Sequence, residues 1–245
     1  MGIVHFLNVK NGDCSIIEHA TGHVSIIDVC NAYEESPLMF ALDEALAELA
    51  KADGLRGNFD QKNHPVNPLA YLRQHGISDI FRFILTHPDM DHMDGLKALC
   101  AAFPPTNFWD TDNKKEIDFG QGSPYKEADW LYYKSIRNGN LTNGPHHLAL
   151  YDGASGKYWN RSETDNGGDG LHILAPTRRL LSDAKSSDDY NDSSYVIVYW
   201  SAGGRVLFAG DSHDDTWEHI LKNHADDVRD VDLLIAPHHG RKSVT

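Results

Sequence analysis

The chain has 245 residues, 40% of them hydrophobic, which is enough to bury a sizeable core in one large α/β domain or two small ones. Its formal net charge of −14 excludes the class of proteins that hold nucleic acid or anionic membranes on a broad basic face. The N-terminus has no basic leader, and no apolar run approaches the roughly 18 residues of a transmembrane helix, so we expect a soluble cytoplasmic protein. Cys14, Cys30 and Cys100 are odd in number and widely spaced, which predicts buried thiols in a reducing compartment.

Short apolar segments separated by the turn signals Asn11-Gly12 and Thr21-Gly22 open the chain, and they predict an antiparallel β-meander over residues 2–9, 14–18 and 24–29. Two helices should follow, each started by a polar residue before a proline. Ser36-Pro37 predicts a helix through Leu38, Leu42, Leu46 and Leu49, and Asn67-Pro68 predicts one that Gly76 ends.

The stretch His87-Pro88-Asp89-Met90-Asp91-His92 is the most informative part of the chain, because four side chains that ligate metals lie within six residues. It follows a buried strand predicted at residues 80–85 and precedes a helix predicted at 95–103, which Pro104-Pro105 ends. The four side chains therefore occupy a loop at the carboxyl end of a strand, where α/β proteins place their sites.

A structural alternative is that Asp91 and Asp94 only cap the next helix and that the two histidines are solvated. Capping needs one carboxylate, whereas residues 87–94 contain three. With the observed spacing, His87 and Asp89 can face one way and Asp91 and His92 another, so one loop can serve two neighbouring cations. We therefore favour a metal site.

The later part of the chain alternates predicted strands with polar loops. We expect strands at 107–109, 147–151, 171–175, 194–200, 205–209 and 231–236, a helix capped by Asp214, and polar loops at 155–170 and 182–193. Residues 111–145 predict an insertion with an aromatic helix from Ser123-Pro124 to Asn138-Gly139, whose aromatic stripe should pack rather than bind substrate. The predicted organisation is a single domain, 1–245, with a first half to about 110, the helical insertion at 111–145, and a second half from about 146.

Three further ligand candidates also stand at predicted strand ends. Asp211 follows the strand at 205–209, and His238-His239 follow the last strand. A strand-end aspartate often caps the next helix, but Asp214 can serve there, which favours Asp211 as a ligand. Asp28, at the end of the third strand, is predicted to hold a ligand rather than to be one, and His146 is a reserve ligand.

The order of these motifs resembles the metallo-β-lactamase superfamily, and most closely the stand-alone relatives of the metal-dependent domain of ComEC-type competence proteins. The resemblance rests on six stretches that span nearly the whole chain: residues 11–13, 26–28, 86–92, 191–194, 207–211 and 236–240. It implies a four-layer αβ/βα sandwich with one or two metal ions at the edge between two sheets. His87 and Asp89 would serve one ion, Asp91 and His92 the other, Asp211 would bridge, and His239, with His238 beside it, would complete the second site.

The sequence departs from this pattern where a later histidine is usual, since Asn191-Asp192-Ser193 stands there, so Asp192 is a reserve ligand for the first ion. The resemblance also implies a further helix and strand after Gly240, which makes a C-terminal truncation the expectation. The carboxylate of Asp89 in place of an imidazole shifts the preference from zinc toward manganese.

Two divalent cations bridged by a carboxylate generate hydroxide at neutral pH and neutralise an anionic transition state, so we predict a metal-dependent hydrolase. Asp91 and Asp211 are the expected catalytic residues. We favour a phosphodiesterase or nuclease that acts on nucleotide or nucleic-acid phosphodiesters. It would hold two zinc or manganese ions, or only one. Because the surface is acidic, the substrate should be small or presented by a protein partner. The alternatives are a lactonase or thioesterase of the same superfamily, and a degenerate scaffold or regulatory protein. The sequence carries no signal of oligomeric state.

Overall fold

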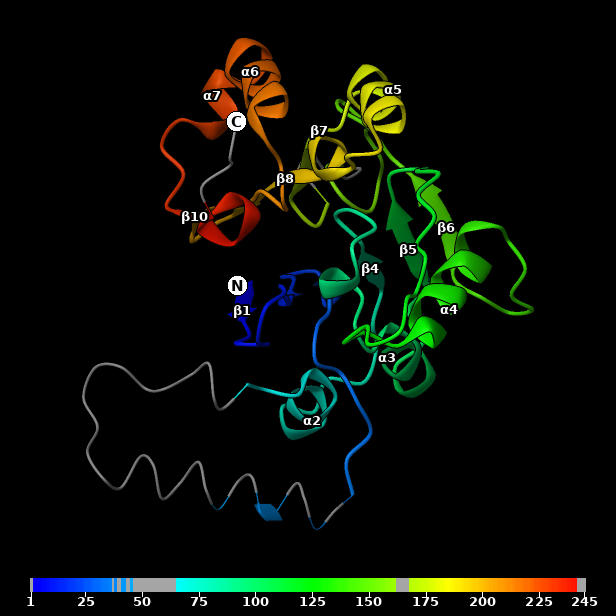
Figure 1. The fold of residues 1–245 in the computed structure, drawn as a ribbon. Coiled ribbons are helices and arrows are strands. Elements are labelled where there is room, and N and C mark those ends of the chain that lie inside the picture. The colour runs from blue at the N-terminus through cyan, green and yellow to red at the C-terminus, as the bar shows by residue number, and fades with distance from the viewer. Residues whose placement is uncertain are drawn as a thin grey trace.

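The computed structural model describes residues 2–36, 38, 41, 42, 45, 65–161 and 168–241. Ten strands form two sheets within these residues (Figure 1). The six-stranded sheet has the order β1 (Ile3–Phe6), β2 (Ser15–Glu18), β3 (Val24–Ile27), β4 (Arg82–Ile84), β5 (Asn107–Asp110) and β6 (His146–Ala149). The four-stranded sheet has the order β10 (Leu233–Ile235), β9 (Gly204–Phe208), β8 (Val196–Ser201) and β7 (Leu171–Ala175).

Both sheets are mixed. The first three strands of the larger sheet form the expected antiparallel meander, and β4, β5 and β6 then add in parallel. In the smaller sheet β7, β8 and β9 are antiparallel, and β10 pairs in parallel with β9. The strand expected to open the second half is β6, and it instead extends the larger sheet.

The helices lie outside the two sheets (Figure 1), and short 3₁₀ turns lie after β4, before β8 and after β10. Their bounds are α2 (Pro68–Gln74), α3 (Leu96–Ala102), α4 (Glu127–Arg137), α5 (Arg178–Ser187), α6 (Asp214–Asn223) and α7 (Ala225–Val228), and the 3₁₀ turns are η2 (Met90–His92), η3 (Asn191–Ser193) and η4 (Pro237–Gly240). None of the helices in the described part of the chain is long and apolar enough to cross a membrane.

Alternate residues of each strand enter different hydrophobic clusters, and this defines four layers. On β2 and β4, Ile16 and Phe83 pack beneath α2, α3 and α4, whereas their neighbours Ile17 and Ile84 face the other sheet. On β8, Ile197 faces the larger sheet, and the flanking valines pack with Ile220 of α6. The order is helices, sheet, sheet, helix, which confirms the expected α/β four-layer sandwich.

Local signals fixed most of these elements. Asn67 caps α2, its side chain accepting a hydrogen bond from the Leu69 amide, as the Asn67-Pro68 pair predicts. The aromatic stripe of the 111–145 segment packs as expected, with Trp130 and Tyr133 of α4 buried in the outer cluster of the larger sheet. The three cysteines are buried free thiols.

Three expectations differ from the structure or fall outside it. The helix expected through Leu38, Leu42, Leu46 and Leu49 lies largely outside the described residues. Residues 182–193 were expected to be a loop, but α5 extends to Ser187, because Thr177 accepts a hydrogen bond from the Leu180 amide and starts a helix upstream of the polar stretch. The cap residue of α6 is His213, and Asp214 is its first helical residue, with no side-chain capping bond.

A buried polar network joins the two sheets. Arg82 of β4 and Asp169, each with a side chain 1% exposed, form an ion pair of 2.6 Å. Arg82 also donates to Ser25 Oγ at 2.8 Å, and Ser25 Oγ lies 2.7 Å from Nε2 of the buried His19. Because Nδ1 of His19 lies 2.9 Å from the carbonyl oxygen of Asp169, this ring donates at Nδ1, accepts at Nε2 and is therefore neutral.

This neutral histidine predicts a loss of stability in acid. Burial lowers the pKa of His19 from 6.5 to about 4. Between these two values the unfolded chain binds a proton that the folded protein does not, so the stabilisation is complete above the unfolded pKa and is lost as the pH falls from 6.5 to about 4. We expect wild type to lose up to about 1.4 kcal/mol per pH unit relative to His19→Gln in this window, measured by urea unfolding. Parallel pH profiles of the two proteins would contradict the assignment.

Candidate metal centre

The loop between β4 and α3 delivers buried imidazoles directly from a strand end. His87 follows β4 by three residues and is 1% exposed, and His92, at the end of η2, is 0% exposed. The turn at Asn11-Gly12 packs against this loop, since a Cβ on Gly12 would lie 1.7 Å from the carbonyl oxygen of Asp91. Glycine is therefore required there for the close backbone approach, which brings Asp13 beside the loop.

Two parallel strands of the smaller sheet deliver the remaining groups. Because β9 and β10 run in parallel, Asp211 and the pair His238-His239 emerge at the same edge. The His238 amide donates to the Gly210 carbonyl at 3.0 Å, which ties the two strand ends together. His238 and His239 both adopt left-handed backbone conformations, with φ of 50° and 54°. Such strain in consecutive non-glycine residues persists where the surroundings enforce it, as at functional sites.

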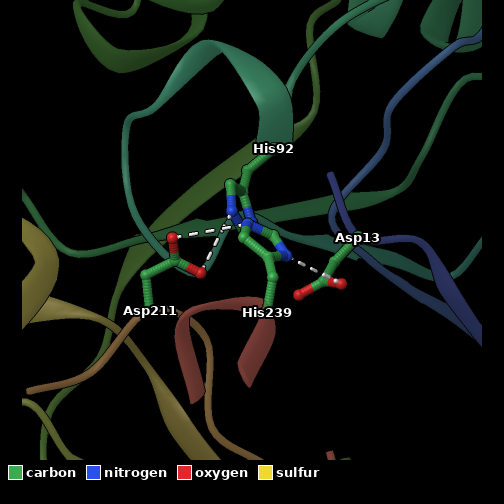
Figure 2. A group of neighbouring side chains, drawn as sticks. All are labelled: Asp13, His92, Asp211 and His239. Atoms are coloured by element: carbon green, nitrogen blue, oxygen red, sulfur yellow. Dashed lines mark ion pairs between the residues drawn. The ribbon is translucent and has the colours of Figure 1, made fainter. Parts of the chain in front are cut away.

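The carboxylate of Asp211 faces the imidazoles of His92 and His239, which lie between Asp211 and Asp13 (Figure 2). Its Oδ1 is 3.3 Å from His92 Nε2, and its Oδ2 is 3.5 Å from His239 Nε2 and 3.7 Å from His87 Nε2. Asp91 approaches from the other side, with Oδ2 3.5 Å from His239 Nε2. One ligand atom from each of Asp13, His92, Asp211 and His239 lies within 4.8 Å of the other three, so this group is a candidate metal site.

Two of the imidazoles have a carboxylate at Nδ1, the ring nitrogen on the far side from Nε2. His92 Nδ1 lies 2.8 Å from Asp28 Oδ2, and His239 Nδ1 lies 3.4 Å from Asp13 Oδ1. Asp28 is itself fixed by the Thr86 amide and hydroxyl, which donate to its two oxygens at 2.7 and 2.6 Å. A carboxylate at Nδ1 fixes the tautomer that presents Nε2 to a metal, so both rings are oriented as ligands.

The atoms at the centre have no hydrogen-bond partner within the described residues. They are His87 Nε2, His92 Nε2, His239 Nε2 and Asp211 Oδ1, all of them buried. Buried polar atoms are nearly always paired, and leaving each one unpaired costs about 1–3 kcal/mol. His92, His239 and Asp211 belong to the group whose ligand atoms lie within 4.8 Å of one another, and His87 Nε2 lies 3.7 Å from the second oxygen of Asp211, so the set fits one or two divalent cations, which accept electron pairs from imidazole nitrogen and carboxylate oxygen alike.

The electrostatics of the cluster favour cation binding. Burial alone would lower the pKa of His92, but the neighbouring Asp28 and Asp211 raise it well above its ordinary value. The adjacent carboxylates of Asp13 and Asp91 raise the pKa of His239 to about 9. Burial opposes ionisation of Asp211, yet the adjacent imidazole of His92, together with those of His87 and His239, holds its pKa well below its usual range. The carboxylates therefore hold positive charge at the positions that a metal ion would occupy.

The His87 side of the centre is built differently. His87 Nε2 lies 3.9 Å from Asp89 Oδ1, but that oxygen is 2.5 Å from Lys115 Nζ. His238 Nε2 lies 3.8 Å from Asp211 Oδ2, and its Nδ1 is 2.9 Å from Nε2 of His213. Asp89 is thus shared between the cluster and a lysine of the 111–145 segment.

The two reserve ligands are not brought into this cluster. His146 is exposed at the amino end of β6, paired with Asn107, whereas the cluster lies beyond the carboxyl ends of the strands. Asp192 accepts hydrogen bonds from Thr216 of α6 through its carbonyl oxygen and its carboxylate. Asp192 was a candidate because it stands where a motif histidine is usual, and His146 because it belongs to a histidine pair in a Gly-Pro turn; neither feature indicates the direction of a side chain.

Sequence reasoning assigned no role to Asp13, Thr86, Lys115 or His213. Asp13 and Thr86 lie within the stretches 11–13 and 86–92 that carry the family resemblance, and this position was the available signal. Lys115 lies in the 111–145 segment, whose path over the site has no local sequence signal. His213 follows Asp211 by two residues, and only this proximity marks it in the sequence.

The role of Asp28 gives a prediction. Asp28→Asn keeps the size of the side chain but weakens the acceptor for His92 Nδ1, so metal affinity should fall by about 10- to 100-fold. The measurement is competition for Zn²⁺ with a chromogenic chelator. Asp79→Asn, an exposed change on the loop before β4, is the matched control and should bind as wild type does. An unchanged affinity in Asp28→Asn would show that this carboxylate does not orient a ligand.

No protein-family model matches the chain, and no curated protein matches it in sequence. Among solved structures, similarity is found to metallo-β-lactamase SMB-1 bound to 2-mercaptoethanesulfonate, with a TM-score of 0.46, 14% identity, and coverage of 96% of this chain and 76% of that one. For CmlA, a diiron β-hydroxylase from Streptomyces venezuelae, the TM-score is 0.44 and the sequence identity 14%, and the match covers 94% of this chain and 33% of that one. For a metallo-β-lactamase family protein from Thermus thermophilus, the TM-score is 0.36 and the sequence identity 15%, and the match covers 89% of this chain and 67% of that one. Since these TM-scores are below 0.5, the functional argument rests on the geometry of the cluster.

Proposed function

We propose that the chain is a metal-dependent hydrolase of the metallo-β-lactamase type that cleaves phosphodiester bonds of a nucleotide or nucleic acid. The observation that carries the proposal is the set of four buried, unpartnered ligand atoms at Asp211, namely its own Oδ1 and the Nε2 atoms of His87, His92 and His239 that face its carboxylate. His92, His239 and Asp211 would hold one cation with Asp91. His87, with Asp89 or His238, would hold a second, and Asp211 lies between the two positions.

When bound, divalent cations here supply Lewis-acid stabilisation of an anionic transition state and activate water at neutral pH. The residues of the chain prepare this chemistry. Asp28 and Asp13 orient the two imidazoles, and burial of His87 lowers its pKa, so that it stays neutral and offers a lone pair. The imidazole and carboxylate donors suit zinc, and the additional oxygen of Asp89 favours manganese on the His87 side.

The charges around the site support an anionic substrate of limited size. Lys115 is 21% exposed and lies beside Asp89, so a cation stands next to the cluster although the whole chain carries a net charge of −14. A lysine in this place attracts a phosphate group, whereas the acidic remainder repels a long polyanion. The resemblance of the sequence to ComEC-type proteins points to the same substrate class.

The test is a comparison of substrates and metals. Metal-free protein is supplied with Zn²⁺ or Mn²⁺ and assayed with an aryl phosphodiester, an aryl ester, a thioester and a lactone. We expect turnover of the phosphodiester, and its absence in Asp211→Asn. If only the esters or the lactone are hydrolysed, the phosphodiesterase proposal is lost and a lactonase or thioesterase takes its place. If no substrate reacts and no metal binds, the chain is a scaffold.

A further inference from the structure

A second group of imidazoles and a carboxylate lies outside the centre described above. Asp152 follows β6, His219 lies on α6, and His224 stands between α6 and α7. One ligand atom from each of the three lies within 4.8 Å of the other two. His224 Nε2 is 2.7 Å from Asp152 Oδ1, and His219 Nε2 is 2.9 Å from Asp152 Oδ2. The side chains are 15–21% exposed, so an ion from solution can reach them.

The helix break at His224 creates this group. Residues five apart on a continuous helix do not share a face, but α6 ends at Asn223 and the backbone of His224 has φ −131° and ψ 26°. The turn brings the two rings to a centroid distance of 5.8 Å, on one carboxylate. The backbone of Asp152 is anchored by a hydrogen bond of 2.9 Å from its amide to the carbonyl oxygen of Pro176.

His224 has a carboxylate at each ring nitrogen. Its Nδ1 lies 3.0 Å from Asp227 Oδ2, and its Nε2 lies 2.7 Å from Asp152 Oδ1. A neutral imidazole has one N–H, so its second nitrogen would turn a lone pair toward a carboxylate. A positive charge at Nε2, either a proton or a metal ion, removes that conflict. With Asp227 at Nδ1, the ring has the carboxylate–histidine arrangement that orients metal ligands.

We propose that Asp152, His219 and His224 form a second, separate cation site that takes Zn²⁺ or a similar borderline divalent ion. Two imidazole nitrogens and one carboxylate oxygen are a zinc donor set, and water from the exposed side completes it. Bonds of about 2.0–2.1 Å in a tetrahedral arrangement separate ligand atoms by roughly 3.3 Å, so the present contacts must open by about half an ångström.

Asn223 can hold the ring of His219 in the tautomer that binds through Nε2. Asn223 Nδ2 lies 3.0 Å from His219 Nδ1, and rotation of that amide presents its oxygen to an Nδ1–H while Nε2 binds the ion. The ion would tie the loop after β6 to the α6–α7 pair. This role is a stabilising link between segments about 70 residues apart, and it does not depend on the proposed hydrolase activity.

The experiment counts Zn²⁺ bound by metal-free protein at neutral pH, by equilibrium dialysis and metal analysis. It compares Asp152→Asn and His224→Gln with wild type, and His146→Gln, an exposed histidine on β6, is the matched control. We expect each of the two variants to bind one Zn²⁺ fewer than wild type, and the control to bind the wild-type number. Hydrolysis by the loaded enzymes should be unchanged.

A second measurement distinguishes a bound metal ion from protons on the two histidines. In an Asp211→Asn background, where the other centre is disabled, Zn²⁺ should raise the melting temperature, and adding His219→Gln should abolish that rise. If all variants bind as many Zn²⁺ as wild type, or if Zn²⁺ raises the melting temperature equally with and without His219, the site is only a pair of protonated histidines on Asp152 and the proposal is wrong.

Discussion

Asp211→Asn is expected to reduce phosphodiester turnover by more than about 10²-fold, beyond the loss typical of a group that only supports a ligand. The two oxygens of Asp211 face three imidazole nitrogens at 3.3–3.7 Å. An amide keeps the shape but loses the negative charge and replaces one oxygen with an N–H₂ donor, which cannot coordinate a cation. Tightly bound metal should fall together with turnover, because one carboxylate would serve both proposed metal positions.

The matched control for this variant is Asp214→Asn. Asp214 is an exposed aspartate three residues later, at the first position of α6, so the same chemical change should leave turnover near the wild-type value and affect helix stability only slightly. Circular dichroism establishes that both variants are folded. Retained turnover in folded Asp211→Asn would contradict the assignment of this cluster as the reaction centre.

Arg82→Ala is expected to lower the free energy of unfolding by about 3–5 kcal/mol, because it leaves Asp169 buried without its charge partner. The pair is 2.6 Å long and lies between the sheets, with both side chains 1% exposed. Asp169 also accepts from Thr21 and contacts His23, but neither replaces a guanidinium. Urea unfolding at pH 7 measures the difference.

Arg73→Ala provides the comparison, since Arg73 pairs with Glu34 at 2.9 Å but both side chains are about half exposed. Exposed pairs contribute about 0–1 kcal/mol, so this variant should unfold nearly as wild type does. If both variants lose the same small amount, the Arg82–Asp169 pair is not what links the two sheets.

Much of the fold could be predicted from local patterns. Alternation in segments such as Ser15–Glu18 and the turn residues between them predict the meander, and Asn67-Pro68 predicts α2. The helix α5 was missed because its surface is polar and its cap, Thr177, precedes basic residues. The pairing of β6 with β5 could not be predicted, since strand partners separated by a long segment depend on tertiary packing rather than on local sequence.

The candidate site was predictable where ligands follow strands. His87, His92, Asp211 and His239 each stand just after an apolar run, and parallel pairing brings such positions to one edge. The groups that orient them were harder to predict. Asp13 reaches the centre only because Gly12 permits a close backbone approach, and Lys115 reaches Asp89 from a segment without local signal. Such contacts are set by side-chain direction, which the sequence does not indicate.

The central claim is that the four converging atoms bind metal, and metal analysis of the protein purified without chelator tests it most directly. We expect one to two equivalents of zinc or manganese at the centre beside Asp211, with that amount lost in Asp211→Asn and kept in Asp214→Asn. Less than about half an equivalent in wild type, or equal metal in wild type and Asp211→Asn, would contradict the claim.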